Sequence, residues 1–171
     1  RDPHGNTTEF HWSQLGRHNL ANACGAIAAA HHVGVAVPVC VEAMESFQGV
    51  KRRLELRGIP GGVSVYDDFA HHPTAIENTL AAVRQHQPGK KLVAVIEPRS
   101  NTMRSGVHAG ELIAATESAD QIFWYQPPEM NWSLADLVEG SARPTAVYSA
   151  IDELVAATAD AVGPGDTVVI M

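Results

Sequence analysis

GVSVYDDFAHHPTAIENT, residues 62–79, is the stretch that decides the fold of this 171-residue chain. Its first half places apolar Val63, Val65 and Tyr66 in a pattern typical of a buried strand. After Pro73, apolar residues recur at the spacing of one helix face. We therefore expect a strand that runs directly into a helix. In open α/β sheets such a turn lies at the carboxyl end of the strand, where ligands bind.

The start of that helix has two possible signals. Pro73 suits a first helical turn, because its φ is fixed and its missing N–H is not needed there. Thr74 and Glu77 have instead the spacing of a capping box. The sequence leaves both starts open.

Two acids and two histidines fill the turn itself, at Asp67, Asp68, His71 and His72. An acidic residue before a helix is common, because a carboxylate accepts from the unpaired N–H groups of the first turn. That explains one Asp but not four polar groups within six positions, so we expect a functional site. Asp68, His71 and His72 are also metal-ligand types. Adjacent histidines usually point in different directions, however, and we predict no metal ligands here.

Composition narrows the function classes. The formal net charge of -7 argues against a nucleic-acid or anionic membrane surface, which would need clustered Lys and Arg. The longest apolar runs are too short to span a bilayer, and no signal peptide is visible. Cys24 and Cys40 lie in apolar helical contexts and are interpreted as reduced core thiols of a cytoplasmic protein. The chain does not begin with Met, and we expect it to be part of a larger protein.

Strand and helix patterns alternate from residue 63 to the end of the chain. This alternation predicts an α/β fold with a Rossmann-like, doubly wound and mostly parallel sheet. Residues 92–96 are a continuous apolar run, as expected of a buried parallel strand. The polar residues 97–104 follow it and should face the same side as Asp68. No G-x-G-x-x-G opens a helix after a strand, and no Walker A sequence is present.

A strong helix near the start of the chain carries His18, Asn19 and Asn22 on one face, because they are spaced three and four residues apart. An asparagine side chain has a donor beside an acceptor, which matches the edge of adenine that proteins read in DNA. The plainer interpretation is that Asn19 caps the helix and the other two are solvated.

Two motifs give the chain a resemblance to a known family. Residues 67–74, DDFAHHPT, resemble the motif that opens the C-terminal domain of the Mur ligases, the ATP-dependent amide ligases of peptidoglycan synthesis. Gly-x-His-Asn-x-x-Asn at residues 16–22 is similar to the end of their central ATPase domain. The resemblance implies that residues 1–47 are the helical end of that central domain. Residues 48–171 would be the C-terminal α/β domain.

The resemblance also implies roles for the polar residues. His18, Asn19 and Asn22 would contact the adenine of ATP, and Asp68 would accept from its ribose hydroxyls, as strand-end carboxylates do in dinucleotide folds. His71 would lie beside the reacting groups for positioning or proton transfer. ATP and Mg²⁺ are the implied cofactors. The P-loop and the Mg²⁺ ligands would lie outside this chain, so residues 1–171 should be inactive alone.

Residues 69–76 and 97–103 resemble the branch of the family that serves cell-wall recycling. That branch joins UDP-N-acetylmuramate to the recovered tripeptide L-alanyl-γ-D-glutamyl-meso-diaminopimelate. We expect the tripeptide to contact Arg99, Asn101, Thr102 and Arg104, since a guanidinium pairs with a carboxylate through two bonds. The plainer alternative is a surface Arg99 that caps a helix or pairs with Glu97.

Two alternative functions stay open beside a third, a binding-only domain that recognises a nucleotide. One is the UDP-N-acetylmuramate–L-alanine ligase of the same family, whose segment at positions 98–104 is of the type Pro-His-Arg-Tyr-Thr-Arg. The other is a metal-dependent α/β hydrolase that uses Asp67, Asp68, His71 and His72.

Overall fold

A computed structural model describes residues 7–99, 103, 109–128, 130 and 132–171. The chain forms two compact units, residues 1–50 and 51–171. No helix within these described ranges is both long and apolar enough to cross a bilayer.

The first unit is a pair of packed helices, α1 (Arg17–His32) and α2 (Val37–Ser46). Helix α1 follows Gly16, whose positive φ of 90° lets the chain turn into the helix, and α2 has a proline in its first turn. Only Ala23 and Cys40 are buried among its described residues. Cys40 is therefore a core thiol as expected, whereas Cys24 is exposed and that part of the prediction is wrong. The assignment of this unit to a central ATPase domain stays a prediction.

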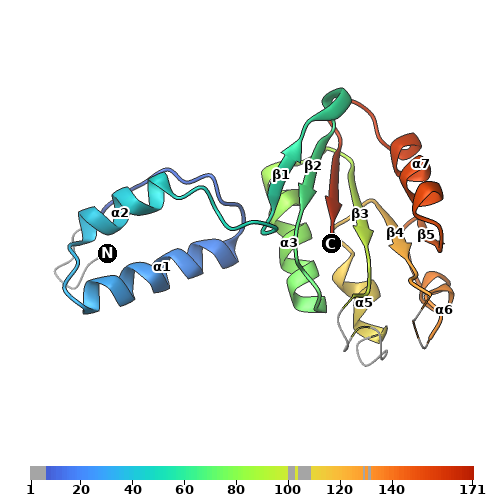
Figure 1. Cartoon of the computed structure of the whole chain (residues 1–171), viewed down its shortest axis with the longest axis horizontal. Helices are drawn as coiled ribbons and strands as arrows, with labels where there is room; N and C mark the ends of the chain where they lie inside the picture. The colour runs from blue at the N-terminus through green and yellow to red at the C-terminus, as the bar shows by residue number, and fades with distance from the viewer. Residues whose placement is uncertain (1–6, 100–102, 104–108, 129, 131) are drawn as a thin grey trace. The chain divides into compact units, whose positions relative to one another are not determined.

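The second unit contains a six-stranded sheet in the order β1-β2-β6-β3-β4-β5 (Figure 1). Its strands are β1 (Glu55–Gly58), β2 (Ser64–Asp67), β3 (Leu92–Ile96), β4 (Gln121–Tyr125), β5 (Thr145–Tyr148) and β6 (Thr167–Ile170). Strand β1 pairs with β2 antiparallel, and the other neighbours are parallel. A short 3₁₀ turn, η1 (Pro60–Gly62), joins β1 to β2. The predicted mostly parallel α/β sheet is confirmed.

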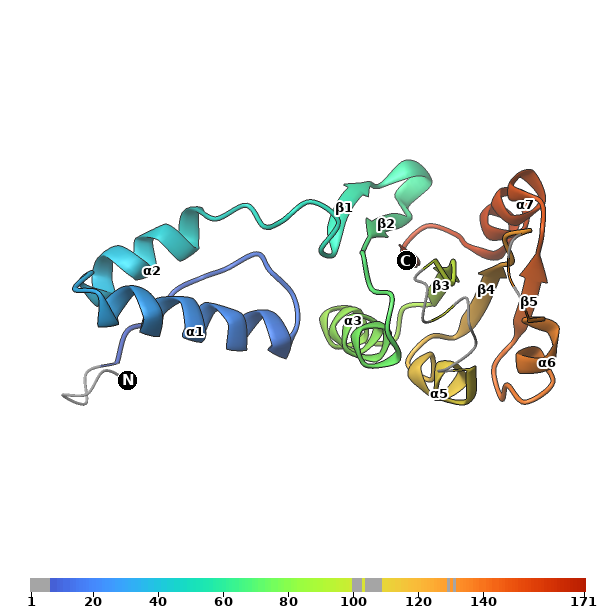
Figure 2. The same ribbon diagram turned by 60° about the horizontal axis from the view of Figure 1, so that its bottom comes forward.

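Among the described residues, the helices between the parallel strands are α3 (Pro73–His86), α5 (Ala109–Ala115), α6 (Ala135–Val138) and α7 (Ile151–Ala161). Figure 2 shows α3 and α5 on one side of the sheet and α7 on the other, so the sheet is doubly wound. Helix α3 begins at Pro73, which confirms the proline start and not the capping box. Its N-cap is His72, whose Nδ1 accepts from the N–H of Thr74 at 3.3 Å.

Helices cover the two faces of the sheet unevenly. On the face toward α3 and α5, alternate residues of the central strands are almost completely buried, among them Leu92, Ile96, Ile122, Trp124 and Val169. Burial of one such Leu or Ile stabilises the fold by roughly 1.5–3 kcal/mol. On the other face, Leu154 of α7 packs on Val93, Phe123 and Val168. Farther from α7, the side chain of Ile170 is 44% exposed although β6 is a central strand.

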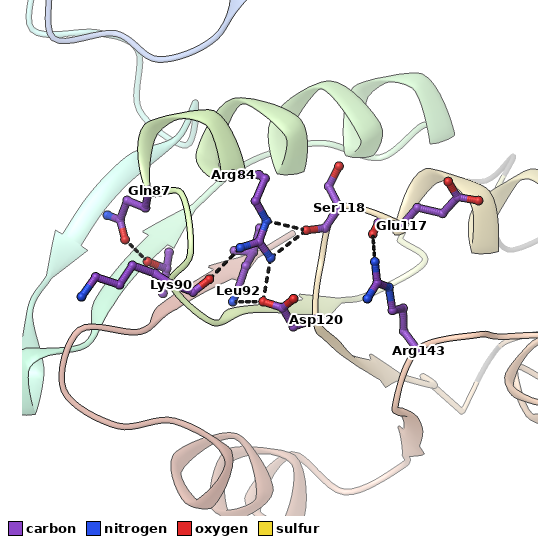
Figure 3. A network of polar contacts seen from close by, with 9 residues as sticks. Arg84, Gln87, Lys90, Leu92, Glu117, Ser118, Asp120 and Arg143 are labelled. Atoms are coloured by element: carbon purple, nitrogen blue, oxygen red, sulfur yellow. Dashed lines mark hydrogen bonds and ion pairs between the residues drawn. The ribbon is translucent and has the colours of Figure 1, made fainter.

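A polar network ties together the loops at the amino ends of the strands (Figure 3). The Arg84 guanidinium donates to the carbonyl oxygens of Ser118 and Lys90 and to the Asp120 carboxylate, the last at 2.6 Å. Asp120 also accepts from the N–H of Leu92 at 2.8 Å. One side chain at the end of α3 therefore fixes the starts of β3 and β4.

Replacing Arg84 with Met should lower the free energy of unfolding by about 1–3 kcal/mol, because several part-buried acceptors lose a charged donor at once. Urea denaturation of the 171-residue chain measures this. Arg143→Met is the matched control, since exposed Arg143 donates to one carbonyl, that of Glu117. It should change the same quantity by no more than about 0.5 kcal/mol. Equal losses in the two variants would show that the Arg84 network does not stabilise the fold.

Candidate functional site

The uneven cover of the sheet leaves a cavity of about 740 Å³ within the second unit. Apolar side chains of β2, β3 and β6 form its floor, and Ile151 and Val155 of α7 form one wall. Polar and charged residues contribute to the lining where β2 and β3 end, namely Arg52, Asp68, His71, Glu97 and Arg99. The cavity thus has a polar end at the carboxyl ends of the strands, where open α/β sheets bind ligands.

Asp68 is a buried carboxylate at this end, with 4% of its surface exposed. Its Oδ2 accepts from the N–H of Leu54 at 2.7 Å, and its Oδ1 accepts from the hydroxyl of Thr79 on α3 at 3.3 Å. Burial raises the pKa of Asp68 above its ordinary value, although hydrogen bonds from Leu54 and Ala70 oppose the shift. A single carboxylate therefore joins the loop before β1 to the helix after β2.

The loop that Asp68 holds has an unusual backbone. Arg52 and Leu54 both have positive φ, 58° and 48°, which costs free energy for residues other than glycine. Two carboxylates stabilise these conformations, since the Arg52 N–H donates to Glu55 Oε2 at 2.9 Å and the Leu54 N–H donates to Asp68. The bond from Arg52 also holds the pKa of Glu55 below its ordinary value.

Arg52 is a site residue that the sequence did not single out. Its Nε donates to Asp67 Oδ1 at 3.3 Å, and its guanidinium lies 5.2 Å from the ring centre of Phe69. The pairing register of β1 with β2 is what would have indicated that Arg52 lies at the site. Antiparallel pairing of β1 with β2 places Glu55 opposite Asp67, so the residues just before β1 meet those that end β2.

The two adjacent histidines have different tasks. His71 is exposed and lines the cavity, and its Nδ1 donates to the Phe69 carbonyl oxygen at 2.8 Å. His72 caps α3, a role that the sequence reasoning did not assign. Asp67 pairs with Arg52. Within the described ranges no three His, Cys, Asp or Glu side chains are grouped to hold a metal ion, so the hydrolase alternative gains no support.

The second polar loop follows β3. Arg99 is exposed at the cavity, and among the described residues no carboxylate lies within ion-pair distance of it, so the alternative in which Arg99 pairs with Glu97 is wrong. Asn101, Thr102 and Arg104 lie outside the described residues. Met103 is buried, and its carbonyl oxygen accepts from the Trp132 indole N–H at 3.0 Å. Trp132 thereby contacts the backbone of Met103, which lies four residues after Arg99 in the sequence.

The three residues expected at adenine lie in the first unit, on α1. His18 and Asn19 are half-buried and Asn22 is exposed. The Asn19 amide donates to the Leu15 carbonyl oxygen at 2.8 Å, and the N-cap of α1 is Gly16, so Asn19 is not the cap. Their contact with a nucleotide stays a prediction.

Comparison with known proteins identifies the second unit. Residues 52–171 match the family described as "Mur ligase, glutamate ligase domain". The chain is 44% identical over 164 residues to the UDP-N-acetylmuramate–L-alanyl-γ-D-glutamyl-meso-2,6-diaminoheptandioate ligase of Escherichia coli K12, covering 95% of this chain and 36% of the relative. It is 34% identical over 165 residues to a UDP-N-acetylmuramate–L-alanine ligase of Mycolicibacterium gilvum, covering 91% of this chain and 34% of that protein.

The fold has a counterpart among solved structures. A murein peptide ligase from Psychrobacter arcticus 273-4 superposes with a TM-score of 0.72 at 39% identity, over 95% of this chain and 35% of that one. The chain thus spans little more than a third of the length of the relatives it matches.

The raised pKa of Asp68 predicts a pH dependence of stability. The Asp68 carboxyl keeps its proton to higher pH in the folded chain than in the unfolded chain. The contribution of Asp68 to the free energy of unfolding therefore falls as the pH rises from the ordinary pKa of 3.8 through the folded pKa. Asp68→Asn cannot ionise and lacks this contribution. In urea denaturation from about pH 3 to pH 7, the free energy of unfolding of the wild type minus that of the variant should therefore fall with pH. A difference that stays level or rises would contradict the shift.

Proposed function

The chain belongs to the Mur ligase family, and on that premise we propose that it is part of an ATP-dependent amide ligase. The ligase joins UDP-N-acetylmuramate to the recycled tripeptide L-alanyl-γ-D-glutamyl-meso-diaminopimelate. The observation that carries this proposal is the 44% identity to a ligase named for that reaction, across 95% of this chain. The 34% identity to an L-alanine ligase makes the L-alanine reaction the second candidate.

The reaction needs a carboxylate activated by ATP and an amine that attacks it, and catalysis depends on positioning. In our proposal His18, Asn19 and Asn22 hold the adenine. Asp68 accepts from the ribose hydroxyls, because a carboxylate has about four lone pairs and Leu54, Ala70 and Thr79 do not use them all.

Mg²⁺ is the second implied cofactor, and the described residues supply no three-ligand group for it. We propose that its ligands and the P-loop lie outside residues 1–171. Bound MgATP would activate the carboxylate of UDP-N-acetylmuramate.

The amine substrate is assigned to the polar end of the cavity. Arg99 is exposed there, and its planar fork suits a carboxylate of the tripeptide. Asn101, Thr102 and Arg104 follow it along the chain and are proposed to add contacts. His71 lines the same end, where its imidazole positions the amine or accepts the proton that the amine loses. Two free cysteines favour the bacterial cytoplasm, and we propose neither a nucleic acid nor a membrane as partner.

An amide-ligation assay on the full-length protein tests the proposal. Product should form with UDP-N-acetylmuramate, MgATP and the tripeptide at a much higher kcat/KM than with L-alanine, and residues 1–171 alone should form none. Arg99→Lys should raise the KM of the tripeptide about tenfold, the equivalent of about 1.4 kcal/mol, and leave the KM of ATP unchanged. Faster ligation of L-alanine would assign the second candidate instead. Ligation by residues 1–171 alone would refute the proposal that the P-loop and the Mg²⁺ ligands lie outside these residues.

A further inference from the structure

We propose that Arg52 and Phe69 form a brace that positions the imidazole of His71, and that Arg52 is therefore a positioning residue of the ligase. The inference rests on the proposed function, in which His71 faces the reacting amine. It assigns a task to Arg52, which the sequence did not single out.

The brace begins with a fixed Arg52. Its backbone has φ 58°, its N–H donates to Glu55 and its side chain pairs with Asp67 at 3.3 Å. An ion pair this exposed would contribute little to stability by itself. Arg52 nevertheless keeps a left-handed conformation that costs of order 1–3 kcal/mol, and such strain persists only where the surroundings determine it. The strained loop therefore serves to place the guanidinium.

Phe69 is the middle of the brace. Its N–H donates to the Arg52 carbonyl oxygen at 2.8 Å, and its ring lies under the guanidinium with 5.2 Å between the guanidinium carbon and the ring centre. The side chain of Phe69 is 44% exposed, so hydrophobic burial does not explain its position. The backbone bond and the cation–π contact to Arg52 do.

Phe69 also makes two contacts with His71. The ring centres of Phe69 and His71 are 4.8 Å apart, and the Phe69 carbonyl oxygen accepts from His71 Nδ1 at 2.8 Å. The carbonyl fixes the tautomer, because Nδ1 must carry the proton to donate to it. The ring fixes the plane of the imidazole. In the neutral imidazole the proton is then on Nδ1 and not on Nε2, which is the tautomer required for Nε2 to accept a proton from an amine.

The competing explanation is that Arg52 binds a substrate directly, since it also lines the cavity. The two explanations differ in what happens when His71 is removed. A positioning residue acts only through the group that it positions, whereas a ligand of the substrate contributes with or without it.

The test uses the full-length ligase with Arg52→Met and Phe69→Leu, each alone and in a His71→Ala background. Each single variant should lower kcat about tenfold and leave the KM of all three substrates within about twofold, because small misplacement of a catalytic group slows the chemical step. In the His71→Ala background the same changes should have no further effect. Phe69→Tyr, which keeps the ring, should restore the wild-type kcat. Arg143→Met, at the opposite ends of the strands, should leave all constants unchanged.

Two results would overturn the inference and assign Arg52 to substrate binding. One is a further tenfold loss of kcat when Arg52→Met is added to His71→Ala, and the other is a raised KM with unchanged kcat in Arg52→Met alone. A wild-type enzyme that does not ligate would refute the proposed function and not the brace, so a second measurement is made on residues 1–171. Nitrogen NMR should show the Nδ1–H tautomer of neutral His71 in the wild type. Both variants keep the carbonyl of residue 69 but lose a side chain of the brace, so the imidazole should no longer stay within hydrogen-bond distance of that carbonyl and a mixture of tautomers should appear. An unchanged tautomer in both would overturn the brace whatever the enzyme does.

Discussion

The hydrogen bond from the Leu54 N–H to the buried carboxylate of Asp68, 2.7 Å long, is the interaction on which the site depends. It joins two segments that lie just beyond the paired ends of β1 and β2, the strained loop before β1 and the turn after β2. Thr79 on α3 donates to the other oxygen of the same carboxylate. Because the carboxylate is withdrawn from water, these bonds are stronger than at a surface, and loss of either partner leaves a buried group unpaired. Loop, turn and helix are thus held in one arrangement.

The position of β6 explains where the cavity forms. This last strand lies between β2 and β3, so the ends of β2 and β3 that carry Asp68 and Glu97 are separated by one strand only. The Asp68 N–H donates to Ile170 and the Glu97 N–H donates to Met171, which fixes both polar loops to the end of β6. On one face α3 and α5 complete the core. On the other, α7 covers mainly β4 and β5, and the uncovered floor becomes the cavity.

The sequence could predict those features that depend on residues close together along the chain. Alternating strand and helix periods gave the doubly wound sheet, and Pro73 marked the start of α3. The rule that ligands bind at strand ends brought Asp68, His71 and Arg99 to one cavity. Pairing order is not local, however, so the place of β6 could not be deduced. The left-handed backbone of Arg52 and Leu54 depends on distant carboxylates, which is why Arg52 was missed. Exposure of Cys24 depends on how α1 packs, which helix periodicity alone does not determine.

Amide hydrogen exchange on residues 1–171 tests most directly whether Asp68 holds the loop to the turn. In the wild type, the Leu54 and Phe69 amides should exchange about a hundredfold or more slower than in an unstructured peptide, since each donates within the joined loop and turn. In Asp68→Ala, protection should be lost at these two amides and kept at the β3 amides of Val93 and Val95. Unprotected Leu54 in the wild type, or a protected Leu54 in the variant, would contradict the account.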